Sequence, residues 1–119
     1  SKMITVRNSE AYHNVAGIEI ENSYYADVYN NYSHGNAGGI LVFDLPDLVV
    51  KSGRSVRVYD NVVVNNNFKN FAPPGNVVAS VPTGTGIMIL ATSDVEIYNN
   101  KIYNNKKHAE VCGADFLLL

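Results

Sequence analysis

The chain has 119 residues, a mass of 13.0 kDa, a net charge of −2 and a pI near 5.8. This length suits a single domain, 1–119, and the charge balance excludes a general electrostatic attraction to nucleic acid. No apolar run approaches the ~18 residues of a membrane span, and the single Cys excludes an internal disulfide and a cysteine-rich zinc site.

The composition favours short strands separated by tight turns. The chain is rich in Asn and Val and contains eight Tyr. Val and Tyr favour strands, whereas Asn favours turns and tolerates left-handed backbone. No segment keeps a 3.6-residue period long enough to predict a helix.

Two short motifs recur along the chain. The first begins with Gly and continues with alternating apolar residues, at Gly17–Ile20, Gly39–Val42 and Gly86–Ile89. The second places an apolar residue and Tyr before two polar turn residues, at Val28–Asn31, Val58–Asn61 and Ile97–Asn100, with a weaker copy at Val6–Ser9.

The spacing of the motifs defines an internal repeat. Val6 to Ile20 and Val28 to Val42 are each 14 positions, and Ile20 to Val28 is 8, which gives a period of 22 residues. Two longer steps predict surface insertions at roughly 43–55 and 67–85. A third series, Asn14, Asn36, Asn66 and Asn105, follows the same steps of 22, 30 and 39.

Each repeat therefore predicts three short strands with alternating inward residues. The first strand points inward with Ile18/Ile20, Ile40/Val42 and Ile87/Ile89. The second does so with Ile4/Val6, Ala26/Val28, Val56/Val58 and Val95/Ile97, and the third with Ala11, Ser33, Val63 and Ile102. We predict an all-β solenoid, a right-handed parallel β-helix of about four 22-residue coils.

The repeated pattern resembles the right-handed parallel β-helix repeats of the pectate-lyase-like superfamily, from Ile4 to about Val111. That group includes polysaccharide lyases, pectin-modifying enzymes and mannuronan C5-epimerases. The resemblance implies the fold more specifically than the activity, since one fold hosts many functions. Its members are often secreted or periplasmic, although no signal peptide opens this chain, which reads as a piece of a longer solenoid or as a short member.

Catalysis in this superfamily implies a charge neutraliser or metal and a base beside the first strand. The outward residues expected there are Glu19, Leu41, Met88 and Glu110, and the two central ones are apolar. The Asp-Pro-His-Asp signature of the epimerases is absent. The remaining catalytic candidates stand in or beside the first insertion: Asp44, Asp47, Lys51 and Arg54.

Each of these four candidates has a catalytic or binding interpretation, and the two aspartates also have a purely structural one. Asp44 and Asp47 can act as acid and base or bind calcium, or they can belong to a solvated turn. Lys51 and Arg54 can receive a uronate carboxylate. A nearby Arg57 falls in register between Asp27 and Glu96, which predicts a cross-coil ion-pair ladder. We expect no resident cofactor.

Ligand binding has one further set of candidates. Tyr12, His34 and Tyr103 share a register with Val64 and predict a partly aromatic outward stripe, which either stacks on sugar rings or shields the third strand. The turn asparagines predict hydrogen-bonded ladders from coil to coil. His13, His34 and His108 are too far apart in the register for a metal site, and Cys112 has no His or acid placed with it.

The sequence leaves two functions open. One is a non-catalytic binding or assembly module that self-associates as a homodimer and takes a polysaccharide as its ligand. The other is a carbohydrate-active enzyme, a lyase, epimerase or hydrolase, acting on an acidic polysaccharide. The apolar residues expected at an exposed interface are Leu41, Phe43, Leu45, Met88, Phe116 and Leu118.

Overall fold

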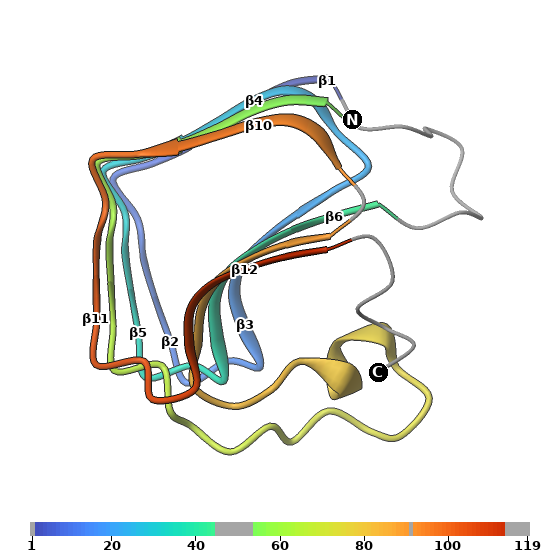
Figure 1. Ribbon diagram of the computed structural model, residues 1–119, viewed down its shortest axis with the longest axis vertical. Helices are drawn as coiled ribbons and strands as arrows, with labels where there is room; N and C mark the ends of the chain where they lie inside the picture. Colours follow the sequence, from blue (N-terminus) through green and yellow to red (C-terminus); the bar gives the residue numbers. More distant parts are fainter. Residues whose placement is uncertain (1, 45–53, 91, 114–119) are drawn as a thin grey trace.

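The chain is built from three parallel sheets of four strands each (Figure 1). The computed structural model describes residues 2–44, 54–90 and 92–113. Sheet A contains β1 (Lys2–Arg7), β4 (Tyr24–Tyr29), β7 (Arg54–Tyr59) and β10 (Ser93–Tyr98). Sheet B contains β2 (Glu10–Tyr12), β5 (Tyr32–His34), β8 (Val62–Val64) and β11 (Lys101–Tyr103). Sheet C contains β3 (Ala16–Glu21), β6 (Gly38–Phe43), β9 (Thr85–Leu90) and β12 (His108–Gly113).

The chain visits the sheets in the order A, B, C and then returns to A. The strand expected first in the sequence repeat lies in sheet C, the second in sheet A and the third in sheet B. Viewed down the shortest axis of the molecule, the strands of each sheet lie one behind another (Figure 1). The molecule measures 32 × 32 × 19 Å, so the shortest dimension runs along the stack.

The inward columns predicted from alternation form the core. Val56, Val58, Ile40 and Ile87 are fully buried, and Val28 pairs with Val58 in adjacent strands. The main cluster joins all three sheets, and its partly buried members lie on the outermost repeats: Ile4, Val6, Ala11, Val95, Ile97 and Ile102. The predicted register is therefore confirmed in sheets A and B and in the first three strands of sheet C.

Asparagine shapes the turn between sheets A and B. The first turn residue is left-handed in each repeat, with φ of 53–55° at Asn8, Asn30, Asp60 and Asn99. Asn and Asp adopt this conformation at lower cost than other side chains. The next residue carries the ladder: Asn31 Nδ2 donates to Asn61 Oδ1 at 3.1 Å, and Asn61 Nδ2 donates to Asn100 Oδ1 at 3.0 Å.

A second ladder follows sheet B. Asn36 Nδ2 donates to Asn66 Oδ1, and Asn66 Nδ2 donates to Asn105 Oδ1, at 3.0 and 2.9 Å. The glycine that opens the first sequence motif lies beside this ladder. A larger residue does not fit there, since an added Cβ at Gly39 would lie 2.7 Å from the carbonyl oxygen of Gly86 in the next strand. Among the described residues, every buried side-chain nitrogen and oxygen atom has a hydrogen-bond partner, so the predicted ladders are confirmed.

The second insertion is folded, and it flanks sheet C. It leaves the repeat after Asn67, contains a short 3₁₀ helix η1 (Val77–Ser80) and returns at Gly84. Asn70 holds it together, because its Nδ2 donates to the carbonyl oxygens of Val78 and Val81 at 2.9 and 2.8 Å. The first insertion lies mostly outside the described residues.

Candidate functional site

The outer face of sheet C is where the family resemblance implies catalysis. In the structure, Leu41 and Met88 are only 2% and 3% exposed, and they pack with Phe43, Leu90 and Val81. Partly buried Val77 and Val78 of the second insertion complete this cover. The cavity left between them has a volume of only about 10 Å³.

The prediction that Leu41, Phe43 and Met88 are exposed is therefore wrong. The insertion folds back over this face and removes the patch from water, which is the ordinary outcome for a contiguous apolar surface. Of the other residues expected at an interface, Leu45, Phe116 and Leu118 lie outside the described residues.

The last strand of sheet C also departs from the predicted register. Glu110 pairs with Ile87, and Val111 pairs with Met88, so the final step is 23 residues instead of 22. The turn after Asn105 is one residue longer because it must follow the returning insertion: Lys107 and His108 N–H both donate to the carbonyl oxygen of Gly84 at 3.0 Å. Glu110 thus occupies an inward column, not the outward position expected.

The acidic residues that remain on this face are Glu19 and Glu21, on the edge strand β3. Partial desolvation raises the pKa of Glu19, and the neighbouring Glu21 carboxylate raises it further. Glu19 is in register with Leu41 and Glu21 with Phe43, so the acidic pair borders an apolar surface. This arrangement offers one carboxylate pair and no cation beside it among the described residues.

The catalytic candidates from the first insertion are not brought together where they are described. Asp44 Oδ1 accepts a hydrogen bond from Thr92 Oγ1 at 3.1 Å. The Arg54 guanidinium lies over the Tyr24 ring, 5.4 Å from its centroid. Asp47 and Lys51 lie outside the described residues, as does the side chain of Cys112.

The predicted ion-pair ladder is present in part. Arg57 Nε and Nη2 donate to the two carboxylate oxygens of Asp27 at 2.7 and 3.0 Å. Glu96 is in register with Arg57 on the other side, but the bidentate pair is made with Asp27 alone among the described residues. This pairing raises the pKa of Arg57, chiefly through the hydrogen bond to Asp27.

The aromatic stripe forms a larger surface than the sequence predicts. His34 stacks between Tyr32 and Tyr12, with ring centroids 4.1 and 5.2 Å away, and its Nε2 lies 2.6 Å from Glu10 Oε2. Tyr12 also meets His13 edge to face at 5.2 Å. Two of the three predicted ligand-binding residues, Tyr12 and His34, are thus in contact.

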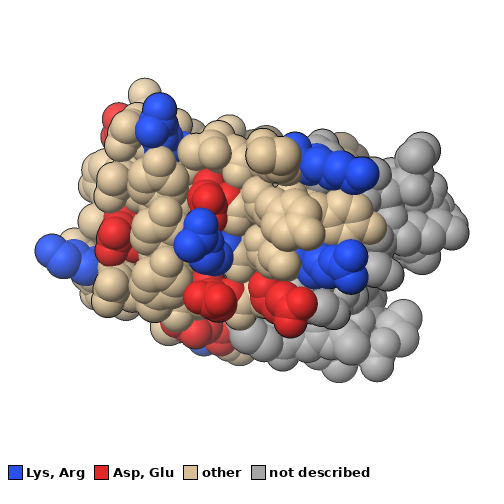
Figure 2. Space-filling view, turned by 90° about the horizontal axis from the view of Figure 1, so that it is seen from above, with Lys and Arg blue, Asp and Glu red and all other residues tan. Residues whose placement is uncertain are grey.

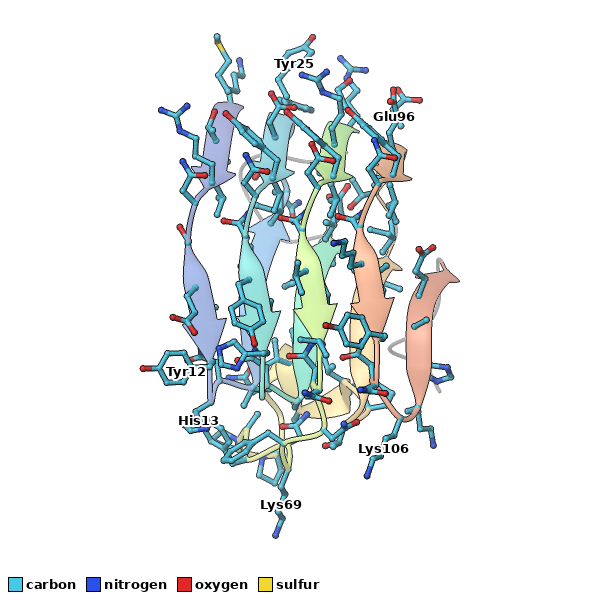
Figure 3. The ribbon with its side chains drawn as sticks, turned by 90° about the vertical axis from the view of Figure 1, so that its left-hand side faces the viewer. Tyr12, His13, Tyr25, Lys69, Glu96 and Lys106 are labelled. Atoms are coloured by element: carbon cyan, nitrogen blue, oxygen red, sulfur yellow. The ribbon has the colours of Figure 1, made fainter. Side chains whose placement is uncertain are left out.

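The ring contacts continue into the second insertion. His13 stacks on Phe68 at 5.4 Å, and Phe68 meets Phe71 edge to face at 6.0 Å. We call the six connected rings the aromatic face: Tyr32, His34, Tyr12, His13, Phe68 and Phe71. Tyr12 and Phe71 are 52% and 59% exposed, and Figure 3 shows Tyr12 and His13 projecting from the lower end of sheet B, with Lys69 below them.

The third predicted ligand-binding residue lies apart from this surface. Tyr103 is exposed on β11, and buried Val64 on β8 separates it from His34 in the register. Sequence reasoning missed Phe68 and Phe71 because the insertion has no repeat register to place them. Their only signal is a pair of large apolar residues, three positions apart, in a segment otherwise rich in Asn and Pro.

No group of three or more His, Cys, Asp or Glu in the described part of the chain is arranged to hold a metal ion. Residues 2–44, 54–90 and 92–113 contain no helix of the length and apolar character that a bilayer span requires.

The comparisons with known proteins agree with the fold. The family model described as "right handed beta helix region" matches residues 1–109. No curated protein and no solved structure gives a significant match. The matched region covers every described strand of sheets A and B and the first three strands of sheet C. With its parallel sheets and its repeat, the chain belongs to the family of right-handed β-helix regions.

Proposed function

We propose that this chain is a non-catalytic carbohydrate-binding module and that the aromatic face binds the polysaccharide. The observation that carries the proposal is the unbroken series of six rings, four of which are at least 42% exposed. The C–H faces of pyranose rings bury apolar area against exposed aromatic rings, and rigid aromatic side chains lose little entropy on binding.

Polar groups beside the rings supply partners for sugar hydroxyls. Glu10 and His34 form a hydrogen-bonded pair at the edge of the aromatic face, 53% and 27% exposed in their side chains. Lys69 follows Phe68 in the chain. The backbone N–H of Lys106 donates to Oδ1 of Asn67, the residue before Phe68, at 2.8 Å. The two ammonium groups favour an acidic polymer over a neutral one.

Catalysis at sheet C is the alternative that the pectate-lyase-like resemblance implies, and we do not favour it. The centre of that face is filled by Leu41 and Met88 beneath the insertion, so a sugar ring has no access there without unfolding of η1. General acid–base chemistry needs titratable groups within hydrogen-bond reach of the scissile bond.

Titration with polygalacturonate, alginate and a neutral glucan, each with and without calcium, tests the proposal. We expect binding without turnover and at least about tenfold weaker binding in the Tyr12→Ala/Phe71→Ala double variant, which is about 1.4 kcal/mol. Tyr98→Ala removes a similarly exposed tyrosine from sheet A and serves as the control. Equal binding by the double variant contradicts the proposal, and turnover abolished by Asp44→Ala contradicts its non-catalytic part.

We further propose that the repeats close into four stacked coils and that two copies of the chain associate through the ends of the stack. Open edges of parallel sheets present unpaired backbone groups, and the core residues at the β1 end, Ile4 and Val6, are only partly buried. A two-fold dimer would bring the same edge of both copies together.

Light scattering at micromolar concentration tests the association. We expect a particle of twice 13.0 kDa, reduced to a monomer by Val6→Lys at one end of the stack. Ile97→Lys, at the same register position in the opposite end strand of sheet A, is the matched control. A folded wild-type monomer that persists at all concentrations contradicts the proposal.

A further inference from the structure

A second hollow lies on the outer face of sheet A, away from the aromatic face. Its volume is about 500 Å³, and it is lined by Tyr25, Asp27, Ser55, Arg57, Asp94, Val95 and Glu96. This volume is within the range of ordinary ligand sites. We call it the sheet A notch. Figure 2 shows this side of the molecule, where acidic and basic side chains lie close to one another.

The notch exists because one side chain in a register column is small. Tyr25 lies on β4, Ser55 on β7 and Asp94 on β10. The register of these neighbouring strands aligns Tyr25 with Ser55 and Ser55 with Asp94. All three have the same left-handed backbone, with φ of 55°, 60° and 54°. The short Ser55 side chain therefore leaves space between the 59% exposed Tyr25 ring on β4 and the carboxylate of Asp94 on β10.

Charged side chains of the next outward register column, Asp27, Arg57 and Glu96, form another side of the notch. Arg57 lies on the same strand as Ser55, and its guanidinium is held by both carboxylate oxygens of Asp27. Glu96, on β10, has no such pairing with Arg57 among the described residues. Figure 3 shows Tyr25 and Glu96 projecting in the same direction from different strands. With Asp27 neutralising Arg57, the carboxylates of Asp94 and Glu96 leave the notch negative.

We propose that the sheet A notch binds an amino sugar, with its ammonium group between the carboxylates of Asp94 and Glu96 and its ring against Tyr25. An ammonium group gains from both carboxylates and from the face of a neighbouring aromatic ring. The Ser55 hydroxyl and the exposed edge of the Arg57 guanidinium offer hydrogen bonds to sugar hydroxyls. The proposal is independent of the aromatic face.

Two other ligand classes fit less well. An anionic sugar would face the carboxylates of Asp94 and Glu96, and Arg57, the only cation among the described residues that line the notch, is already paired. A lysine side chain carries the same ammonium group, but it has no ring for Tyr25 and no hydroxyls for Ser55. A hollow of about 500 Å³ also exceeds what one alkyl ammonium fills.

The experiment is a calorimetric titration of the whole chain at low salt and about pH 5.5, where amines are protonated and ordinary carboxyls are ionised. The probes are a β-1,4-linked glucosamine tetramer, its fully N-acetylated form and tetralysine. We expect the glucosamine tetramer to bind at least about tenfold more tightly than the acetylated form and than tetralysine, which is about 1.4 kcal/mol.

The variant Ser55→Tyr fills the notch without requiring a new backbone conformation, because Tyr25 already occupies the equivalent position of the preceding strand. We expect it to fold and to weaken glucosamine binding at least about tenfold, as Asp94→Asn/Glu96→Gln does. The matched control Tyr98→Ala removes an exposed ring of sheet A that does not line the notch, and it leaves this binding unchanged. Undiminished binding by folded Ser55→Tyr, or equal binding of the acetylated tetramer or of tetralysine, overturns the proposal.

Discussion

A single amide in the Asn ladder serves several backbone groups at once. Asn61 Oδ1 accepts from both the backbone N–H and the Nδ2 of Asn31, at 3.0 and 3.1 Å. Its Nδ2 donates to the carbonyl oxygen of Val28 and to Asn100 Oδ1. Because Asn61 is 1% exposed, water cannot replace these bonds if the side chain is removed.

Asn61→Ala is therefore expected to reduce the free energy of unfolding by about 3 kcal/mol or more, since each buried group left unsatisfied costs about 1–3 kcal/mol. Urea denaturation measures the loss. Ser9→Ala is the control, because Ser9 holds the same ladder position in the first repeat but is exposed, and its hydroxyl donates within its own turn, to the carbonyl oxygen of Arg7. A similar loss in both variants would mean that ladder hydrogen bonds do not determine stability.

Glu19 links stability to pH. Desolvation and Glu21 raise its pKa above 4.5, which means that the folded state holds the proton more tightly than the unfolded chain. Stability is therefore unaffected while Glu19 is protonated in both states, and it falls as the pH rises from 4.5 through the folded pKa.

Glu19→Gln removes the penalty of an ionised Glu19. We expect the melting temperature to rise at pH about 7 and to change little at pH about 4, where the carboxyl is already neutral. Glu96→Gln, at an exposed position of β10, is the control. An equal effect of Glu19→Gln at both pH values would contradict this account.

At the scale of elements, the second insertion acts as a cover for sheet C. It carries no strand of its own, and Asn70 gathers its backbone around η1 by accepting from Ala72 N–H and donating to Val78 and Val81. The cover contributes apolar contacts to Leu41 and Met88 that the main core does not supply.

Asn70→Ala is expected to loosen this cover while the three sheets stay folded. The amides of residues 77–81 should then exchange hydrogen faster, and a dye specific for exposed apolar surface should bind near Leu41 and Met88. Lys69→Ala changes the neighbouring exposed residue and should have neither effect. Unchanged exchange in Asn70→Ala would show that the apolar contacts alone hold η1 in place.

Period and alternation were enough to predict the inward columns, because residues such as Val28 and Val58 recur at positions that a strand must bury. They failed at Glu110, because one additional turn residue reverses the face of every later residue in a strand. That residue is needed only because Gly84 returns from the insertion beside Lys107 and His108.

The surface was harder to predict than the core. The burial of Leu41 and Met88 depends on where the insertion folds back, which no local pattern encodes. Tyr12 and His34 were found because they share a register, whereas Phe68 and Phe71 join them only through the path of that same insertion.

At the scale of the whole molecule, stability depends on one continuous apolar stack. Val58 is fully buried and lies between Val28 and Ile97 in sheet A. Each repeat buries its inward residues only against its neighbours, so the repeats cannot fold independently.

Val58→Asp is expected to prevent folding, because an unpaired carboxylate in this position costs several kcal/mol and interrupts the stack at its middle. Circular dichroism and a thermal melt measure the outcome. Val62→Asp places the same charge at an only partly buried, outward position of the next strand and should fold. A cooperative melt of Val58→Asp would contradict the inward assignment.

The Asn ladders run in one direction along the stack. Asn31 completes the turn that holds Ser9, Asn61 completes that of Asn31, and Asn100 completes that of Asn61. The amide that finishes a turn always comes from the repeat made later. Because a ribosome delivers the amino-terminal repeats first, the N–H of each newly made turn can bond only to water until the next repeat is made. The hydrogen bonds thus give the stack a direction, in which each later repeat completes the turn of the repeat before it.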